Sequence, residues 1–148
     1  MISPFAHITL QAGLCLTDFT ISQMRALGVY SKNDGMWPCA PLEKGKNENT
    51  MVLGEGAAMF SLEKNVGQKC LARIIGCGYA TEIIEHNASL SINADCMQKS
   101  IRMALEDARL TSVDVVLMHA PGTVQGDDAE VRAVKEVLGE DVHMISTK

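Results

Sequence analysis

A nearly unbroken apolar run late in the chain constrains the fold most strongly. Residues 113–118 are almost all Val, Leu or Met, which is typical of a central parallel strand buried on both faces of a sheet. A helical pattern over 127–138 and a short apolar stretch over 142–146 follow it. We expect a strand over 113–119, this helix and a second strand to form a βαβ unit, because parallel strands require a crossover of this kind.

Two other segments have the spacing of amphipathic helices. Apolar residues recur every three or four positions over about 18–27 and, more clearly, over about 93–109. The helix over 127–138 opens with Asp127 and Glu130, whose spacing is that of a capping box.

Three further stretches have the apolar character of strands, namely 6–15, 51–62 and 70–79. The second of them contains Gly54 and Gly56, which leave little side-chain bulk. Glycine inside a strand predicts a close approach of another backbone.

Size and composition fit one globular domain. The chain has 148 residues, of which 47% are apolar and 21% charged, and this length suffices for one buried core. Mixed helices and strands make the expected class α/β. The segment 31–50 is rich in Asn, Lys, Gly and Pro, and we expect a surface loop there.

Charge and cysteine usage exclude several classes of function. The net charge is −5 and the basic residues are scattered, so we expect no nucleic-acid partner. No apolar run approaches the roughly 18 residues of a membrane span, and no signal region is evident. The five cysteines form no C-x-x-C pair, and we expect reduced thiols, a cytoplasmic location and no metal site.

Chemically active side chains follow both strands of the predicted βαβ unit. His119 closes the first strand and Lys148 follows the second. In open parallel sheets, ligands bind at the carboxyl ends of the strands, beside the N-termini of helices. Thr123 adds a hydroxyl, and the helix amides favour negative charge. We therefore predict a site for an anionic intermediate at this edge.

Each of these residues also has a simpler explanation. A His at the end of a strand is more often structural than catalytic, and a lysine at the end of a chain is normally solvated. A capping role alone would account for Glu130. Residue patterns by themselves thus lead only to an α/β domain with one candidate site.

The spacing around His119 resembles the signature of β-ketoacyl synthases. That signature reads His-Gly-Thr-x-Thr, then Asn-Asp, then Glu eleven residues after the His. His119, Thr123, Asp127 and Glu130 match it in position, and the family's Ser-Thr-Lys at the end of the next strand appears at 146–148.

Upstream landmarks occur in the same order as in the family. Residues 52–59 read Val-Leu-Gly-Glu-Gly-Ala-Ala-Met, and residues 39–43 resemble Cys-x-Pro-Phe-Asp. The resemblance implies a partial thiolase-like α/β fold in one domain over 1–148. About 1–80 would end the N-terminal half of a doubled αβαβα architecture, and about 81–148 would begin its C-terminal half.

The resemblance also implies a condensing acyltransferase. Family members join malonyl-carrier to an acyl thioester with loss of CO2, in fatty-acid or polyketide-type synthesis, using a Cys-His-His site with a buried lysine. By resemblance His119 and Lys148 are catalytic. Asp127 and Glu130 would support them, with Glu130 and Lys148 fixing each other's charge, and Thr123 would contact the pantetheine arm.

The implied partners are acyl carrier protein and a synthase subunit, in a homodimer or heterodimer. No cofactor is expected beyond the carrier's phosphopantetheine. The nucleophilic Cys and second His are expected before residue 1 and after Lys148, so the isolated chain should be inactive. Pro121, which replaces the family's first Thr, leaves room for a non-catalytic partner resembling a chain-length factor. An unrelated small enzyme with His119 as its base is a third hypothesis.

Overall fold

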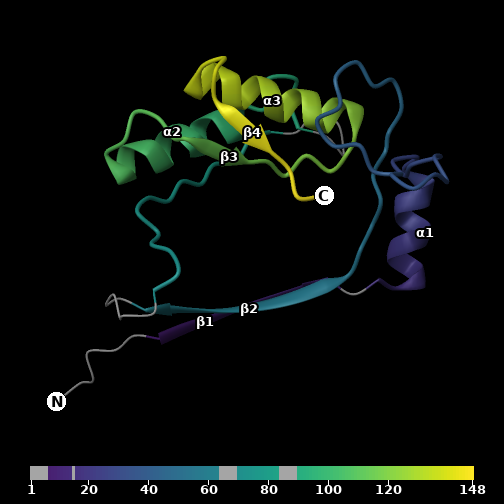
Figure 1. The fold of residues 1–148 in the computed structure, drawn as a ribbon, viewed down its shortest axis with the longest axis horizontal. Helices are drawn as coiled ribbons and strands as arrows, with labels where there is room; N and C mark the ends of the chain where they lie inside the picture. The colour runs from purple at the N-terminus through teal and green to yellow at the C-terminus, as the bar shows by residue number, and fades with distance from the viewer. Residues whose placement is uncertain (1–6, 15, 64–69, 84–89) are drawn as a thin grey trace.

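Helices and strands alternate along the chain in the computed structural model, which describes residues 7–14, 16–63, 70–83 and 90–148. Figure 1 shows α2, α3, β3 and β4 gathered in one layered body, with a β1–β2 ribbon below it and α1 at one end. The elements are β1 (His7–Leu14), α1 (Asp18–Ala26), β2 (Gly56–Glu63), α2 (Asp95–Ala108), β3 (Val115–Leu117), α3 (Val124–Leu138) and β4 (His143–Ile145).

The predicted βαβ unit is confirmed. Strands β3 and β4 pair in parallel, with Val115 opposite His143 and Leu117 opposite Ile145, and α3 connects them. The expectation that this strand is buried on both faces is wrong for the described residues. Val115 and Leu117 are 49% and 62% exposed, because the described helices cover only the face that carries Val116.

The hydrophobic core lies between this small sheet and the two helices. Met118, Ala120 and Val134 are buried at its centre. Ala94, at the N-cap of α2, forms a second cluster with Ala129 and Ala133 of α3, where small side chains let the two helices pack closely. The half-buried residues that complete the main cluster are Leu42, Ile101, Val116, Val131, Leu138, Val142 and Met144.

Helix positions agree with the sequence patterns, except at the start of α3. Helices α1 and α2 lie where their apolar spacing predicts them. Helix α3 begins at Val124, three residues before Asp127, with Thr123 as its N-cap. The expected capping box is therefore wrong. The Val124 amide instead donates to Oδ1 of Asn49 at 3.0 Å.

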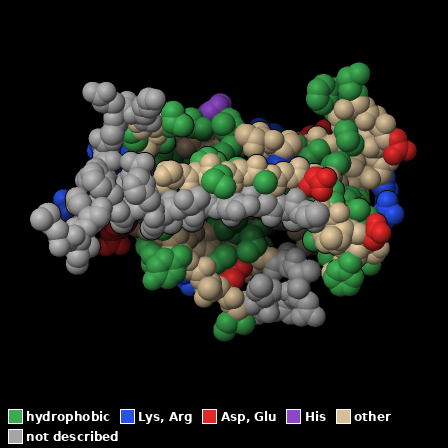
Figure 2. All heavy atoms as spheres, turned by 90° about the horizontal axis from the view of Figure 1, so that it is seen from below, with side chains coloured by type: hydrophobic (Ala, Val, Ile, Leu, Met, Phe, Trp, Pro, Cys, Tyr) green, Lys and Arg blue, Asp and Glu red, His purple; other side chains and the backbone are tan. Residues whose placement is uncertain are grey.

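Strands β1 and β2 form an antiparallel ribbon, which contacts none of the other helices and strands of the described chain. Met59 and Phe60 are 67% and 61% exposed, and Figure 2 shows green hydrophobic side chains on this side of the molecule. Strand β2 starts only at Gly56. The close approach expected at Gly54 and Gly56 is absent, since nothing described lies within 4 Å of a Cβ built there.

The strand predicted over 70–79 does not form. This segment is irregular and lies along α2, where the Cys77 amide donates to Oδ2 of Asp107 at 3.0 Å. Two glycines allow the contact. A Cβ on Gly76 would lie 2.3 Å from the Ala104 carbonyl oxygen, and a Cβ on Gly78 would lie 1.9 Å from that of Ser100.

Replacing Gly78 with Ala should destabilise the chain by about 2 kcal/mol, because the new methyl group would overlap helix backbone that cannot move aside cheaply. Urea unfolding followed by circular dichroism measures this change. Gly54→Ala is the matched control, since its Cβ would meet open space. Equal unfolding free energies for the two variants would contradict the close contact with α2.

Candidate functional site

The two predicted active side chains meet at the carboxyl edge of the β3–β4 pair. The Met118 amide donates to the Ile145 carbonyl at 2.8 Å, which extends the ladder by one step. His119 and Lys148 then leave the sheet at the same edge. Lys148 Nζ lies 3.2 Å from His119 Nδ1, within hydrogen-bond distance, and both residues are exposed.

The main chain at His119 is held by a buried carboxylate. Glu130, on α3, is 7% exposed. Its Oε1 accepts from the His119 amide and its Oε2 from the Ala120 amide, each at 2.7 Å. The expected pairing of Glu130 with Lys148 is not found, because neither an ion pair nor a hydrogen bond joins these two described residues. Glu130 thus fixes the backbone that carries the histidine.

Asp127 anchors the loop that follows His119. This residue is 2% exposed. Its Oδ1 accepts from the Gly122 amide at 3.0 Å, and its Oδ2 accepts from the Leu42 amide at 3.1 Å and from the Lys46 ammonium. One carboxylate therefore joins the start of α3 to the 120–122 turn and to the segment around Lys46.

The segment predicted as a surface loop, 31–50, contacts the site through Lys46, Asn49 and Thr50. The Thr50 amide and hydroxyl both donate to the Gly122 carbonyl, at 2.8 and 3.0 Å. The Lys46 side chain is only 7% exposed. Residue patterns missed Lys46, Asn49 and Thr50 as parts of the site, because a polar stretch without period carries no signal of burial.

Thr123 is the N-cap of α3 and lines a cavity of about 690 Å³. The cavity is lined by apolar side chains, by the loop that follows His119 and by Asn47 and Asn49. Its lining residues are Leu27, Val29, Asn47, Asn49, Leu90, Met97, His119, Pro121, Thr123, Val124, Gln125, Gly126 and Glu130. The predicted site residues His119, Thr123 and Glu130 thus share one cavity.

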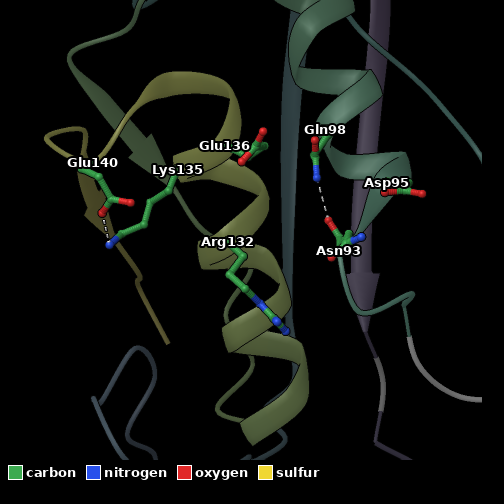
Figure 3. Close-up of a pocket in the computed structure, with 7 residues that line it drawn as sticks. All are labelled: Asn93, Asp95, Gln98, Arg132, Lys135, Glu136 and Glu140. Carbon is green, nitrogen blue, oxygen red and sulfur yellow. Dashed lines mark hydrogen bonds and ion pairs between the residues drawn. The ribbon is translucent and has the colours of Figure 1, made fainter.

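A second hollow, of about 550 Å³, lies between the exposed sides of α2 and α3. Figure 3 shows Lys135 turned toward Glu140, at 2.5 Å, and Gln98 toward Asn93. Arg132, a third polar group of this hollow, donates to the Asp128 carbonyl at 3.3 Å rather than to another lining residue. We therefore place the candidate site at the His119 cavity.

Glu82 caps α2 from outside the helix. Its carboxylate accepts from the Ser91 amide at 2.8 Å, the Ser91 hydroxyl at 2.9 Å and the Cys96 amide at 3.0 Å. The bond from the Ser91 amide, followed by that from the Cys96 amide, lowers the pKa of Glu82. Burial, and then the Glu82 charge, raises the pKa of the Cys96 thiol.

Glu82→Gln should lower the melting temperature by about 3 °C at pH 7. Because the folded pKa of Glu82 is lowered, its stabilisation is present above the unfolded value of about 4.3 and disappears as the pH falls through the folded value. The melting-temperature deficit of Glu82→Gln relative to wild type should therefore be largest at pH 7 and shrink progressively as the pH is lowered below about 4.3. Glu106→Gln, at an exposed position on the same helix, is the control. A deficit that does not shrink as the pH falls would argue against this account.

Within the described ranges, no helix is both long and apolar enough to cross a membrane. The same residues contain no cluster of three or more His, Cys, Asp or Glu arranged to hold a metal ion.

Comparisons with known proteins agree on one family. Residues 71–148 match the model of the β-ketoacyl synthase C-terminal domain. The granaticin polyketide putative β-ketoacyl synthase 1 of Streptomyces violaceoruber is 43% identical over 104 residues, which are 66% of this chain and 24% of that protein. The 3-oxoacyl-[acyl-carrier-protein] synthase 2 of Vibrio harveyi is 33% identical over 108 residues, which are 68% of this chain and 25% of that protein. The chain thus spans about a quarter of these curated relatives.

Solved ketosynthases have the same fold. A chain of the ketosynthase–chain length factor complex from Xenorhabdus doucetiae superposes with a TM-score of 0.80 at 20% identity. The match covers 96% of this chain and 34% of that one. The expected partial thiolase-like α/β fold is therefore confirmed.

Proposed function

Because the chain belongs to the β-ketoacyl synthase family, whose members are condensing acyltransferases, we propose that it supplies the His119 side of such an active site. The observation that carries the proposal is the contact of His119 with Lys148 at 3.2 Å, on a loop fixed by Glu130. We also propose that residues up to about 80 end one half of the doubled fold, and that 81–148 begin the other.

The reaction that we propose joins the α-carbon of malonyl-carrier to the carbonyl carbon of an acyl thioester. Malonyl-carrier breaks the bond to its carboxylate and releases CO2, and the electron pair stays on the α-carbon as an enolate. That carbon attacks the carbonyl of an acyl group held as a thioester on a cysteine. A carbon–carbon bond forms, and the cysteine leaves as a thiolate. Negative charge develops on the thioester oxygen, so the site needs hydrogen-bond donors positioned there in advance.

The contact with Lys148 favours the tautomer of His119 that can donate a hydrogen bond to this developing charge. A lysine ammonium donates hydrogen bonds and accepts none. When it bonds to Nδ1, that nitrogen is the acceptor, and the ring proton is placed on Nε2. His119 then offers an Nε2–H donor to the developing negative charge. Thr123, on the same cavity, would bond the pantetheine arm of the substrate.

We propose acyl carrier protein as the substrate-bearing partner and a synthase subunit as the dimer partner. The name of the Vibrio harveyi relative specifies an acyl carrier protein, which supports the first of these. The phosphopantetheine thioester supplies the activated carbon, so the proposed reaction requires no separate cofactor.

Flanking DNA tests the proposal most cheaply. We expect the upstream frame to encode a cysteine between a strand and a helix, and the downstream frame to encode a Thr-Gly-His within a few residues of Lys148. The isolated 148-residue chain should then form no condensation product. Frames that lack both motifs, or condensation by the isolated chain, would overturn the proposal.

Pro121 favours a second candidate function. It replaces a hydroxyl-bearing residue of the family signature and lines the cavity, where it provides no donor for a pantetheine arm. The chain could then serve in a non-catalytic subunit like the chain length factor of the Xenorhabdus complex. Co-purification with a complete synthase that retains its own cysteine would support this alternative, and failure to bind any synthase would remove it.

A further inference from the structure

A buried ion pair lies directly behind the His119 loop. Lys46 belongs to the segment between α1 and β2, and Asp127 lies 81 positions further along the chain, in α3. Their side chains are 7% and 3% exposed. The ammonium also donates to the Ala40 carbonyl at 3.2 Å. Both charges are therefore removed from water, and each depends on the other for compensation.

Asp127 transmits this pairing to the turn after His119. Its other oxygen, Oδ1, holds the Gly122 amide at 3.0 Å, while Thr50 holds the Gly122 carbonyl from the opposite side. A Cβ on Gly122 would lie 2.8 Å from the Thr50 hydroxyl oxygen, so the turn has no room to shift toward Thr50. The amide of Gly122 is thus fixed by α3, five positions away, and its carbonyl by Thr50, a residue 72 positions away in sequence.

We propose that Lys46 is a positioning residue for the site: by compensating Asp127, it holds the turn at Gly122 and thereby sets the spacing between His119 and Thr123. The inference rests on the proposed function, because that function gives the spacing its purpose. The part of the inference that concerns the fold, namely that Lys46 holds the turn at Gly122, does not depend on that function. Without Lys46, Asp127 would be a buried charge lacking its cation and would be drawn toward water, loosening its bond to Gly122.

Amide hydrogen exchange on the 148-residue chain tests the inference without requiring activity. Lys46→Met should speed exchange of the Gly122 amide by about tenfold or more, since it weakens a bond to a carboxylate. The Met118 amide, bonded to Ile145 in the sheet, should change by less than about twofold. Lys46→Arg keeps the charge and should restore slow exchange at Gly122.

Lys135→Met is the matched control, because Lys135 is a lysine on α3 whose ion pair with Glu140 is solvent-exposed. This variant should leave the exchange rates of the Gly122 and Met118 amides unchanged. If exchange of the Gly122 and Met118 amides accelerated equally in Lys46→Met, the variant would be generally destabilised and the inference would be overturned. An unchanged exchange rate at Gly122 would overturn it as well.

Should Lys46→Met fail to fold, the double variant Lys46→Met, Asp127→Asn separates the outcomes. The asparagine side chain carries no charge and keeps one carbonyl oxygen for the Gly122 amide, while its NH2 group faces the Leu42 amide, so the double variant should fold more readily than Lys46→Met and still protect Gly122. Its failure to fold would overturn the inference. Because exchange is independent of condensation, flanking frames without the catalytic motifs would reject the proposed function and leave this result standing.

Discussion

Replacing His119 with Ala in the full-length synthase that we propose should reduce the condensation rate by about 10²–10³-fold, the usual effect of removing one donor from a developing oxyanion. The loss should appear in kcat at saturating malonyl-carrier, because the donor acts when the charge forms. The rate of β-ketoacyl-carrier formation, followed by mass spectrometry, measures it.

His143 provides the matched control for this variant. It is an exposed histidine on β4, and His143→Ala should retain activity within about twofold, as surface substitutions generally do. Lys148→Met should also lower kcat, because the tautomer of His119 would no longer be fixed from Nδ1. If the His119→Ala enzyme kept the wild-type kcat and an intact fold, the proposed role of His119 in catalysis would be contradicted.

Replacing Glu130 with Ala should cost about 3 kcal/mol of unfolding free energy in the 148-residue chain. The change leaves the amides of His119 and Ala120 without their acceptor, and each unsatisfied buried amide costs about 1–3 kcal/mol. Glu130→Gln should cost less, since its carbonyl oxygen can still accept from one amide while its NH2 group faces the other. Urea denaturation monitored by circular dichroism measures both changes.

Glu136→Ala, at an exposed position six residues further along α3, is the comparison for Glu130→Ala. It should change stability by less than about 0.5 kcal/mol. If the two alanine variants were equally stable, the carboxylate of Glu130 would not be holding the His119 loop, and the geometric basis of the site would be lost.

The βαβ unit was predictable because its evidence is local. An apolar run, a helical period and a second strand follow one another along 113–146, and parallel pairing then places the residues after both strands at one edge. The meeting of His119 with Lys148 follows from that rule. The family landmarks in turn indicated which chemistry these two residues would perform, although their catalytic roles stay predictions.

Interactions between distant segments were not predictable. The polar composition of 31–50 is that of a solvated loop, and only the fold shows that Lys46 is buried against Asp127. Glu130 has the spacing of a capping residue, but its partners lie 10 and 11 positions away, in the loop just after β3. A local pattern records which residues are close in sequence and says nothing of a partner across the fold.

The failed strand over 70–79 has a related cause. Ile74 and Ile75 give it strand-like composition, but a strand also needs a neighbour with free backbone groups. Among the described residues, the available neighbour is α2, and Gly76 and Gly78 fit its backbone. Composition identified an apolar segment, but the strand predicted from it was wrong because composition does not show what the segment packs against.

One measurement tests the central claim most directly: incubation of the full-length polypeptide with isotopically labelled malonyl-carrier and an acyl-carrier, followed by mass spectrometry of the carrier-bound product. The account predicts a β-ketoacyl thioester that retains the label of the malonyl α-carbon, together with released CO2, and loss of both with His119→Ala. Malonyl-carrier recovered unchanged with the wild-type polypeptide would contradict it.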